Sequence, residues 1–118
     1  MDPLAEFRRA EELLATGDPL AAARVIEPLA DAESNNAMVQ ALAGRAYFAT
    51  AQLRRAEAAF TRVVELDPSD HWARFALGRT FERQNRPAQA AQQYRIAAAM
   101  HPDPSYSEAL RRVGRRIS

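Results

Sequence analysis

The chain has 118 residues, of which 47% are hydrophobic, and a formal net charge of +1; its basic residues are all Arg and it contains no Cys. A chain of this size suits one domain that buries roughly 65% of its unfolded surface, and its many alanines favour helix because Ala loses no side-chain entropy there. The nearly balanced charge argues against a strongly electrostatic nucleic-acid binder, and the lack of Cys excludes disulfides and thiolate metal sites.

The N-terminal segment and the apolar runs carry no sign of a membrane or export route. Met1-Asp2-Pro3-Leu4 has no basic flank followed by an apolar core, so we expect no secretory signal. No apolar run approaches the roughly 20 residues that span a bilayer. We therefore expect a cytoplasmic protein with no membrane partner. Because the chain starts with Met1-Asp2-Pro3 and ends in an amphipathic segment, we also expect it to be complete.

Short interruptions divide the chain into helical segments. Asp2-Pro3 and Asp18-Pro19 are typical of helix starts, with Asp as the N-cap and Pro in the first turn. Asp67-Pro68, Asn85-Arg86-Pro87 and His101-Pro102 mark later breaks, since Pro disfavours helix in the residue before it. Between the breaks, apolar residues recur three and four apart, and no segment alternates like a strand. The pattern predicts an all-α fold with helices at about residues 3–15, 19–32, 36–50, 53–66, 70–84, 87–100 and 105–117.

An internal repeat of 34 residues runs through these segments. The same offset joins Gly44 to Gly78, Tyr47 to Phe81, Ala56 to Ala90, Phe60 to Tyr94 and Pro68 to Pro102. A weaker copy one step earlier contains Leu13, Ala22 and Ile26. Gly is costly inside a helix, so we expect a neighbouring helix to approach Gly44 and Gly78 closely. One helical hairpin cannot bury its own apolar face, and about three in a stack are the stable minimum.

These residues resemble the signature of the tetratricopeptide repeat, which is W-x2-L-G-x2-Y, then A-x3-F, then P over about 34 residues. The third unit matches with Leu77-Gly78-x2-Phe81, Ala90-x3-Tyr94 and Pro102, and the second with Ala43-Gly44-x2-Tyr47, Ala56-x3-Phe60 and Pro68. The first unit departs from the signature with Arg9-Ala10-x2-Leu13, Ala22-x3-Ile26 and Ser34, and the signature Trp is replaced by Glu6, Gln40 and Arg74.

The resemblance covers about residues 3–104. It implies a right-handed α-solenoid of three antiparallel hairpins, at about residues 3–36, 37–70 and 71–104, within a single domain of residues 1–118. Residues 105–118 would form a capping helix. In that helix, the apolar stripe expected to dock consists of Tyr106, Leu110, Val113 and Ile117, and the other side carries Arg111, Arg112, Arg115 and Arg116. Such arginines are typical of a solvated face; the alternative is an acidic partner such as RNA or an anionic membrane.

Signs of catalysis or of a metal site are weak. The chain has no G-x-S-x-G, no P-loop and only 4 Gly residues, so we expect no enzyme activity and no cofactor. Two histidines, His71 and His101, lie near acidic residues at breaks between helices, namely Asp67, Asp70 and Asp103. A metal site at these turns is conceivable, but H-E-x-x-H spacing is absent and solvated turn residues are the simpler interpretation.

In the tetratricopeptide family the first helix of each hairpin faces a concave groove that usually binds peptides. Carried over by register, the groove would be lined by Phe7, Glu11, Leu14, Met38, Ala41, Arg45, Phe48, Trp72, Phe75, Arg79, Glu82 and Arg83. Many of these are large and apolar although the hairpins do not need them for packing, and exposed apolar patches mark interaction sites. Trp and Arg are also enriched at binding hot spots.

Several interpretations of this face stay open at the level of sequence. Met38 and Trp72 could be mostly core, and Phe48 and Phe75 could bury each other. One column of the repeat consists of Glu11, Arg45 and Arg79, which could form inter-repeat ion pairs worth about 0–1 kcal/mol. Alternatively, Arg45, Arg79 and Arg83 could hold an acidic side chain or a terminal carboxylate by bidentate hydrogen bonds.

The resemblance implies a non-catalytic module that binds a peptide or protein segment, whose identity the sequence does not indicate. The alternative is a homo-oligomerising scaffold that pairs two copies through the apolar face or the last helix. Heat-shock co-chaperones of this family clamp a C-terminal Glu-Glu-Val-Asp tail with Lys, Asn and Arg on these first helices. The matching positions hold Phe7, Glu11, Leu42, Trp72 and Ala76, so binding of that tail is not expected.

Overall fold

The structure is a computed structural model in which residues 2–117 are described. These residues form seven α-helices and no strand: α1 (Pro3–Ala15), α2 (Pro19–Ala32), α3 (Ala37–Ala49), α4 (Leu53–Leu66), α5 (His71–Arg83), α6 (Pro87–Met100) and α7 (Pro104–Ile117). The seven predicted helices are confirmed, and each begins and ends within one residue of the predicted range.

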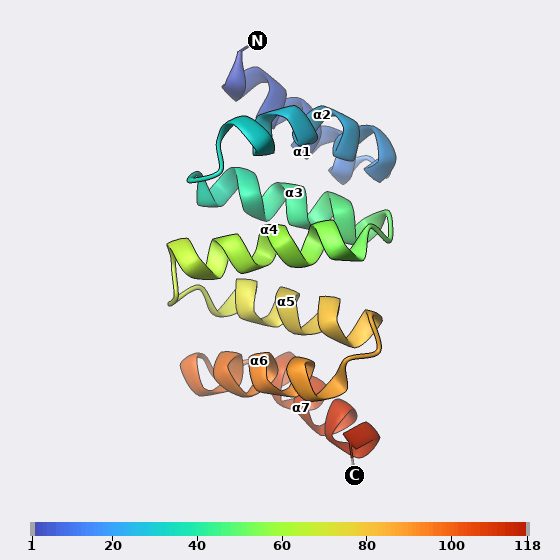
Figure 1. Cartoon of the computed structure of the whole chain (residues 1–118), viewed down its shortest axis with the longest axis vertical. Helices are drawn as coiled ribbons and strands as arrows, with labels where there is room; N and C mark the ends of the chain where they lie inside the picture. Colours follow the sequence, from blue (N-terminus) through green and yellow to red (C-terminus); the bar gives the residue numbers. More distant parts are fainter. Residues whose placement is uncertain (1, 118) are drawn as a thin grey trace.

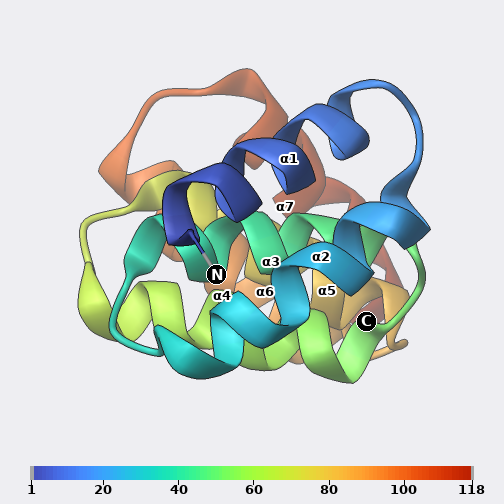
Figure 2. The ribbon, with the colours of Figure 1, turned by 90° about the horizontal axis from the view of Figure 1, so that it is seen from above.

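The helices stack in chain order into an elongated solenoid of 48 × 24 × 21 Å, with the N- and C-termini at opposite ends (Figure 1). Each helix packs on the next one along the chain, and α1 also touches α3. Viewed down the long axis, α1 lies at one edge of the stack and α4 at the opposite edge (Figure 2). First and second helices therefore form two layers, which gives the molecule two distinct faces.

Short polar side chains begin α1, α2, α3 and α5, as the sequence indicated for the first two of these helices. Asp2 and Asp18 accept hydrogen bonds from the backbone N–H groups of Leu4 and Ala21, at 3.1 and 3.2 Å. The equivalent caps of α3 and α5 are Asn36 and Asp70. Each cap satisfies a backbone donor that the first turn leaves free, and Pro3 and Pro19 add a preset φ at the start of their helices.

The turn inside each hairpin has one geometry, repeated at the 34-residue offset. Gly17, Ala51 and Asn85 have positive φ values of 88°, 59° and 59°. After each of them, the next backbone N–H reaches back to a carbonyl five residues earlier, at 2.8, 2.8 and 2.9 Å. This is the Schellman closure of a helix C-terminus, and it gives the chain the same backbone geometry before each second helix.

The two helical glycines, Gly44 and Gly78, allow the close approach of a neighbouring helix that the sequence predicted. A Cβ at Gly44 would lie 2.6 Å from Phe60 Cε1, and one at Gly78 would lie 2.6 Å from Tyr94 Cε1. Both rings belong to the second helix of the same hairpin and are almost fully buried. The second and third hairpins are thus each held by an aromatic ring packed directly against the bare backbone of a glycine, which leaves the other side of the first helix free to face outward.

The last helix closes the stack. Tyr106, Ala109 and Val113 of α7 are buried, and Leu110 packs partly against the core. The prediction that Ile117 belongs to this docked stripe is wrong: its side chain is 50% exposed, because the end of α7 lies at the extremity of the molecule (Figure 1). Within residues 2–117, no helix has the length and apolar character needed to cross a bilayer.

Candidate functional site: an inner groove

A row of connected hollows runs along the face formed by α1, α3, α5 and α7. The hollows have volumes of about 280, 500, 380 and 450 Å³ from the N-terminal to the C-terminal end, and neighbouring hollows share lining side chains. We call this row the inner groove. The residues predicted for the groove that line it are Phe7, Glu11, Leu14, Met38, Ala41, Arg45, Phe48, Trp72, Arg79, Glu82 and Arg83. Phe75 lines none of the four hollows.

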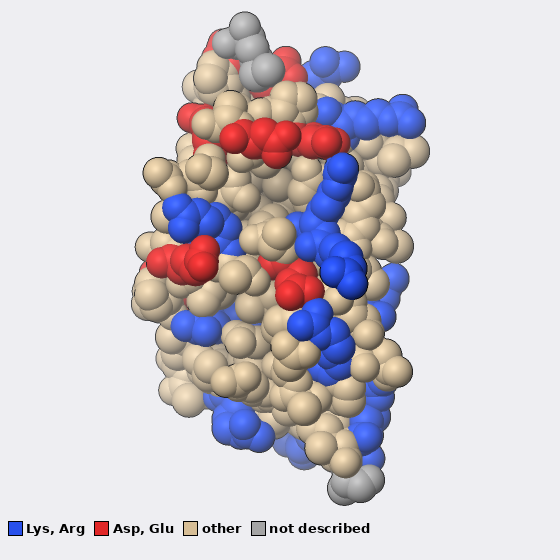
Figure 3. Space-filling view, viewed as in Figure 1, with Lys and Arg blue, Asp and Glu red and all other residues tan. Residues whose placement is uncertain are grey.

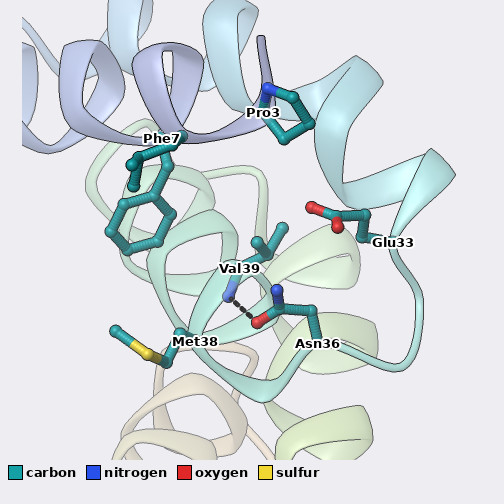
Figure 4. A pocket seen from close by; sticks show the side chains of 7 residues that line it. Pro3, Phe7, Glu33, Asn36, Met38 and Val39 are labelled. Carbon is teal, nitrogen blue, oxygen red and sulfur yellow. Dashed lines mark hydrogen bonds between the residues drawn. The ribbon is translucent and has the colours of Figure 1, made fainter.

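The N-terminal end of the groove is apolar. Phe7 from α1 and Met38 from α3 approach the same hollow, which Pro3 and Val39 also line (Figure 4). The Met38 side chain is 69% exposed, which is high for a large apolar residue in a folded chain. Asn36 borders this hollow, but its side-chain oxygen is occupied by capping α3 at the N–H of Val39. Glu33 also borders this hollow, so this end offers mainly apolar contact area with one carboxylate at its border.

In the middle of the groove, Trp72 projects from the first turn of α5. Its ring meets the edge of buried Phe60 at a centroid distance of 5.8 Å and an angle of 78°. The residue is nevertheless 40% exposed, and it lines the two central hollows. The interpretation in which Met38 and Trp72 are mostly core is thus wrong. Packing against Phe60 holds the indole in place while much of its surface remains open to solvent.

Phe48 and Phe75 do not bury each other as one interpretation allowed. The guanidinium of Arg79 lies 4.8 Å from the Phe48 ring centroid and 5.9 Å from that of Phe75, and Arg83 lies 5.2 Å from Phe48. Phe75 packs instead on Tyr106, with ring centroids 4.9 Å apart. Phe75 is therefore a packing residue where α5 meets α7, whereas Phe48 stays in the groove beneath two arginines.

Glu82 lies in the groove but its carboxylate is already bound. It accepts hydrogen bonds from Arg112 Nε at 3.0 Å, Arg112 Nη2 at 2.8 Å and the Tyr94 hydroxyl at 2.7 Å. The bidentate bond from Arg112 is the main reason that the pKa of Glu82 is lowered; the Tyr94 hydrogen bond acts in the same direction, and burial opposes both. Burial, followed by the bond to Glu82, raises the pKa of Tyr94. Glu82 stays ionised and joins α5 to α6 and α7.

Within the described residues, the column of Glu11, Arg45 and Arg79 forms no inter-repeat ion pairs. Among residues 2–117, the ion pairs that link consecutive repeats are Glu27–Arg55 at 3.0 Å and Glu57–Arg86 at 2.7 Å. These four residues belong to the second helices and their starts, outside the groove. The charges of the column are therefore left facing the groove.

The two histidines form a small aromatic cluster at the turns. The rings of His71 and His101 stack with centroids 4.2 Å apart, and His71 Nδ1 is 2.7 Å from the Tyr106 hydroxyl. The nearby carboxylates of Asp70 and Asp103 accept backbone N–H bonds at the starts of α5 and α7. In the described part of the chain, no three His, Cys, Asp or Glu residues gather in a metal-binding arrangement.

This architecture matches a known family of helical repeats. A family model described as tetratricopeptide repeat matches residues 7–71, 41–106 and 75–115, which together span most of the chain. The chain belongs to the tetratricopeptide-repeat family. No curated protein sequence matches it significantly.

Solved structures of tetratricopeptide proteins superpose on nearly all of this chain. The first repeat domain of Spaghetti (RPAP3), bound to the HSP90 peptide SRMEEVD, is 18% identical with a TM-score of 0.89, covering 98% of this chain and 92% of that one. The Arabidopsis OM64 domain is 17% identical with a TM-score of 0.88, covering 98% and 96%. MamA from Desulfovibrio magneticus is 21% identical with a TM-score of 0.92, covering 98% and 66%. At these identities the similarity establishes the fold.

The groove of this tetratricopeptide protein includes side chains that sequence reasoning missed. Arg112 and Arg116 of α7 line its C-terminal hollow, and Pro3 and Leu4 line its N-terminal one. The arginines of α7 were visible as a cluster, but the capping helix lies outside the repeat register. Register could therefore not indicate which of them turn toward the groove.

Proposed function

We propose that this tetratricopeptide protein is a non-catalytic interaction module that binds a segment of another protein in its inner groove. The observation that carries the proposal is the exposure of Met38 and Trp72, which are 69% and 40% exposed on one continuous hollowed face. Burying such side chains contributes about 25 cal/mol per Å² of apolar area. The groove is built on packed helices, so little conformational entropy is lost on binding.

The structural neighbours support the mode of binding and leave the ligand open. The Spaghetti domain, which has the same fold, was solved bound to the HSP90 peptide SRMEEVD. The positions that would clamp an acidic tail hold Phe7, Glu11, Leu42, Trp72 and Ala76 in this chain. We therefore expect a ligand different from that peptide, bound mainly through its apolar side chains.

A pair of charge-introducing double variants tests the proposal. Met38→Glu with Trp72→Glu places two charges in the groove, and Leu20→Glu with Met100→Glu places two at exposed apolar sites on second helices. Both should give the circular dichroism of the wild type. Proteins captured from a lysate of the source organism should be lost with the groove variant and kept with the control. Equal capture by the two variants would contradict the proposal.

Self-association is the competing use of the same face, and sedimentation velocity over a dilution series separates the two. A monomer at all concentrations supports the peptide-binding proposal. A dimer that the groove variant dissociates and the control variant preserves would instead identify the chain as a homo-oligomerising scaffold.

A further inference from the structure

Four arginines from two helices converge at the C-terminal end of the inner groove. Arg79 and Arg83 come from α5, Arg112 and Arg116 come from α7, and together they line a hollow of about 450 Å³ with Phe48 and Glu82. We call these four residues the arginine basin. They are up to 37 residues apart in sequence, since 116 − 79 = 37, and only the docking of α7 brings them together.

The two arginines from α7 are held in place and keep spare donors. Arg112 donates two hydrogen bonds to Glu82, and Arg116 Nη2 donates to Asn85 Oδ1 at 2.6 Å. A guanidinium has five N–H donors, so each of these side chains retains several for a ligand. Their positions are therefore fixed before binding, which lowers the entropy lost when a ligand is bound.

The two arginines from α5 have no acidic partner within residues 2–117. Arg79 and Arg83 instead lie over the Phe48 ring, at 4.8 and 5.2 Å from its centroid. Among the described residues, Glu82 is the one carboxylate that lines the basin, so four positive charges face one negative charge there. A guanidinium pairs with carboxylates and phosphates through two parallel hydrogen bonds, and carboxylates are the groups that Asp and Glu of a protein segment carry.

Charge also changes along the groove. The central hollow is bordered by Glu11 and Arg45, and the N-terminal hollow is lined mainly by apolar residues, with Asn36 and Glu33 at its border. On the face formed by the second helices, acidic and basic side chains are interspersed except at the C-terminal end, where the charged residues in view are arginines (Figure 3). Along the groove, positive charge is thus greatest in the C-terminal hollow, at the same end of the molecule as the arginines seen on the second-helix face.

We infer that the arginine basin binds Asp or Glu side chains of a partner peptide whose apolar side chains occupy the N-terminal half of the groove. This inference rests on the proposed function and adds to it the chemistry and the direction of the ligand. A nucleic acid fits less well, because the positive charge forms no extended stripe and both arginines of α5 cover the Phe48 ring on which a base would stack.

A peptide-selection experiment tests the inference while the natural partner is still unidentified. The solenoid is 48 Å long, and an extended strand rises about 3.3 Å per residue, so random peptides of about 12 residues span most of the groove. Peptides displayed on phage are selected on the wild-type protein. Their dissociation constants are then measured by fluorescence anisotropy for Arg79→Gln with Arg83→Gln, and for a control that loses the same charge outside the groove, Arg24→Gln with Arg95→Gln.

We expect the selected peptides to be rich in Asp or Glu toward one end and in large apolar residues toward the other. Their affinity should fall about tenfold in the basin variant, stay within about twofold of wild type in the control, and weaken as salt is raised. Glu82 keeps its bonds to Arg112 in both variants, so the docking of α7 is preserved.

Three outcomes would overturn the inference, and they differ in what they say about the groove. If peptides lacking acidic residues are selected, bind the basin variant as well as the wild type, and lose affinity for Met38→Glu with Trp72→Glu, the groove is a binding site but the basin is not. If no peptide binds above background, or binding survives the Met38→Glu and Trp72→Glu changes, the proposed function itself fails. A dimer that the basin variant dissociates would place a second copy of the chain in the groove.

Discussion

Gly78 and Gly114 both lie inside helices, but in opposite surroundings. A Cβ on Gly78 would be 2.6 Å from the ring of Tyr94, whereas one on Gly114 would meet no atom within 4 Å. Tyr94 is fully buried and hydrogen-bonded to Glu82, so its ring has little room to move. The glycine of the repeat is therefore a packing requirement, and the glycine of the capping helix is not.

This contrast predicts stability changes of opposite sign. Gly78→Ala should lower the free energy of unfolding by about 1 kcal/mol or more, because overpacking costs about 1–3 kcal/mol and exceeds the helix-propensity gain. Gly114→Ala should raise it by about 0.5–1 kcal/mol. Urea denaturation of both variants measures the two values. An equal gain at both positions would mean that the Tyr94 ring shifts freely and that the close approach is not required.

At the scale of helices, Glu82 is the link between α5 and the cap. Its carboxylate joins Tyr94 of α6 to Arg112 of α7, and its side chain is 18% exposed. Because these bonds hold the pKa of Glu82 below the ordinary glutamate value of about 4.3, the ionised form stabilises the folded state. This contribution is complete above about pH 4.3 and is lost as the pH falls through the lower folded-state pKa.

We therefore expect Glu82→Gln to lower the free energy of unfolding by about 1–2 kcal/mol at pH 7. The difference from wild type should shrink as the pH is lowered below about 4, because protonation then removes the same interaction from the wild type. Urea denaturation at several pH values measures this difference. Glu108→Gln, at an exposed position on α7, is the matched control and should change stability little at any pH. A pH-independent difference for Glu82→Gln would show that its charge is not the cause.

Over the whole molecule, the helices differ in how many neighbours cover them. In α1 the buried residue is Ala10, whereas α3 has seven buried residues and lies between α2 and α4. In a solenoid, stability is close to a sum of contacts between neighbouring repeats, so helices at the ends open more readily than those in the middle.

Hydrogen exchange followed by mass spectrometry should therefore find the fastest exchange in α1 and the slowest in α3, α4 and α5. In Glu82→Gln, exchange should quicken in α7 while α1 stays unchanged, because these two helices lie at opposite ends of the stack (Figure 1). Uniform protection from α1 to α7 would indicate that the solenoid opens only as a single cooperative unit.

The sequence predicted the helices and most of the groove because both depend on local signals repeated at one spacing. Asp-Pro pairs begin α1 and α2, and the 34-residue register places Met38 and Trp72 on the same face. The 34-residue register gave a wrong expectation where a helix outside the repeat, α7, packs against the first helices. Phe75 occupies a groove position in the repeat, yet Tyr106 of α7 covers it, and the reach of Arg112 into the groove depends on how α7 docks. Contacts between distant helices leave no periodic trace in the sequence.

The shared left-handed turn at Gly17, Ala51 and Asn85 bears on how the side chains that line the inner groove are spaced along the solenoid. Each hairpin closes in the same way, and in the turns between hairpins Asn36 and Asp70 donate their N–H groups to the carbonyls of Glu33 and Asp67 at 3.1 Å, so we expect equivalent positions of successive first helices to recur at a similar step along the solenoid. A ligand that contacts several repeats must then carry its contacting side chains at intervals that match this step. Lengthening one such turn by a single residue would change that interval while every groove side chain kept its identity. Affinity for a rigid ligand would then depend on spacing as much as on composition.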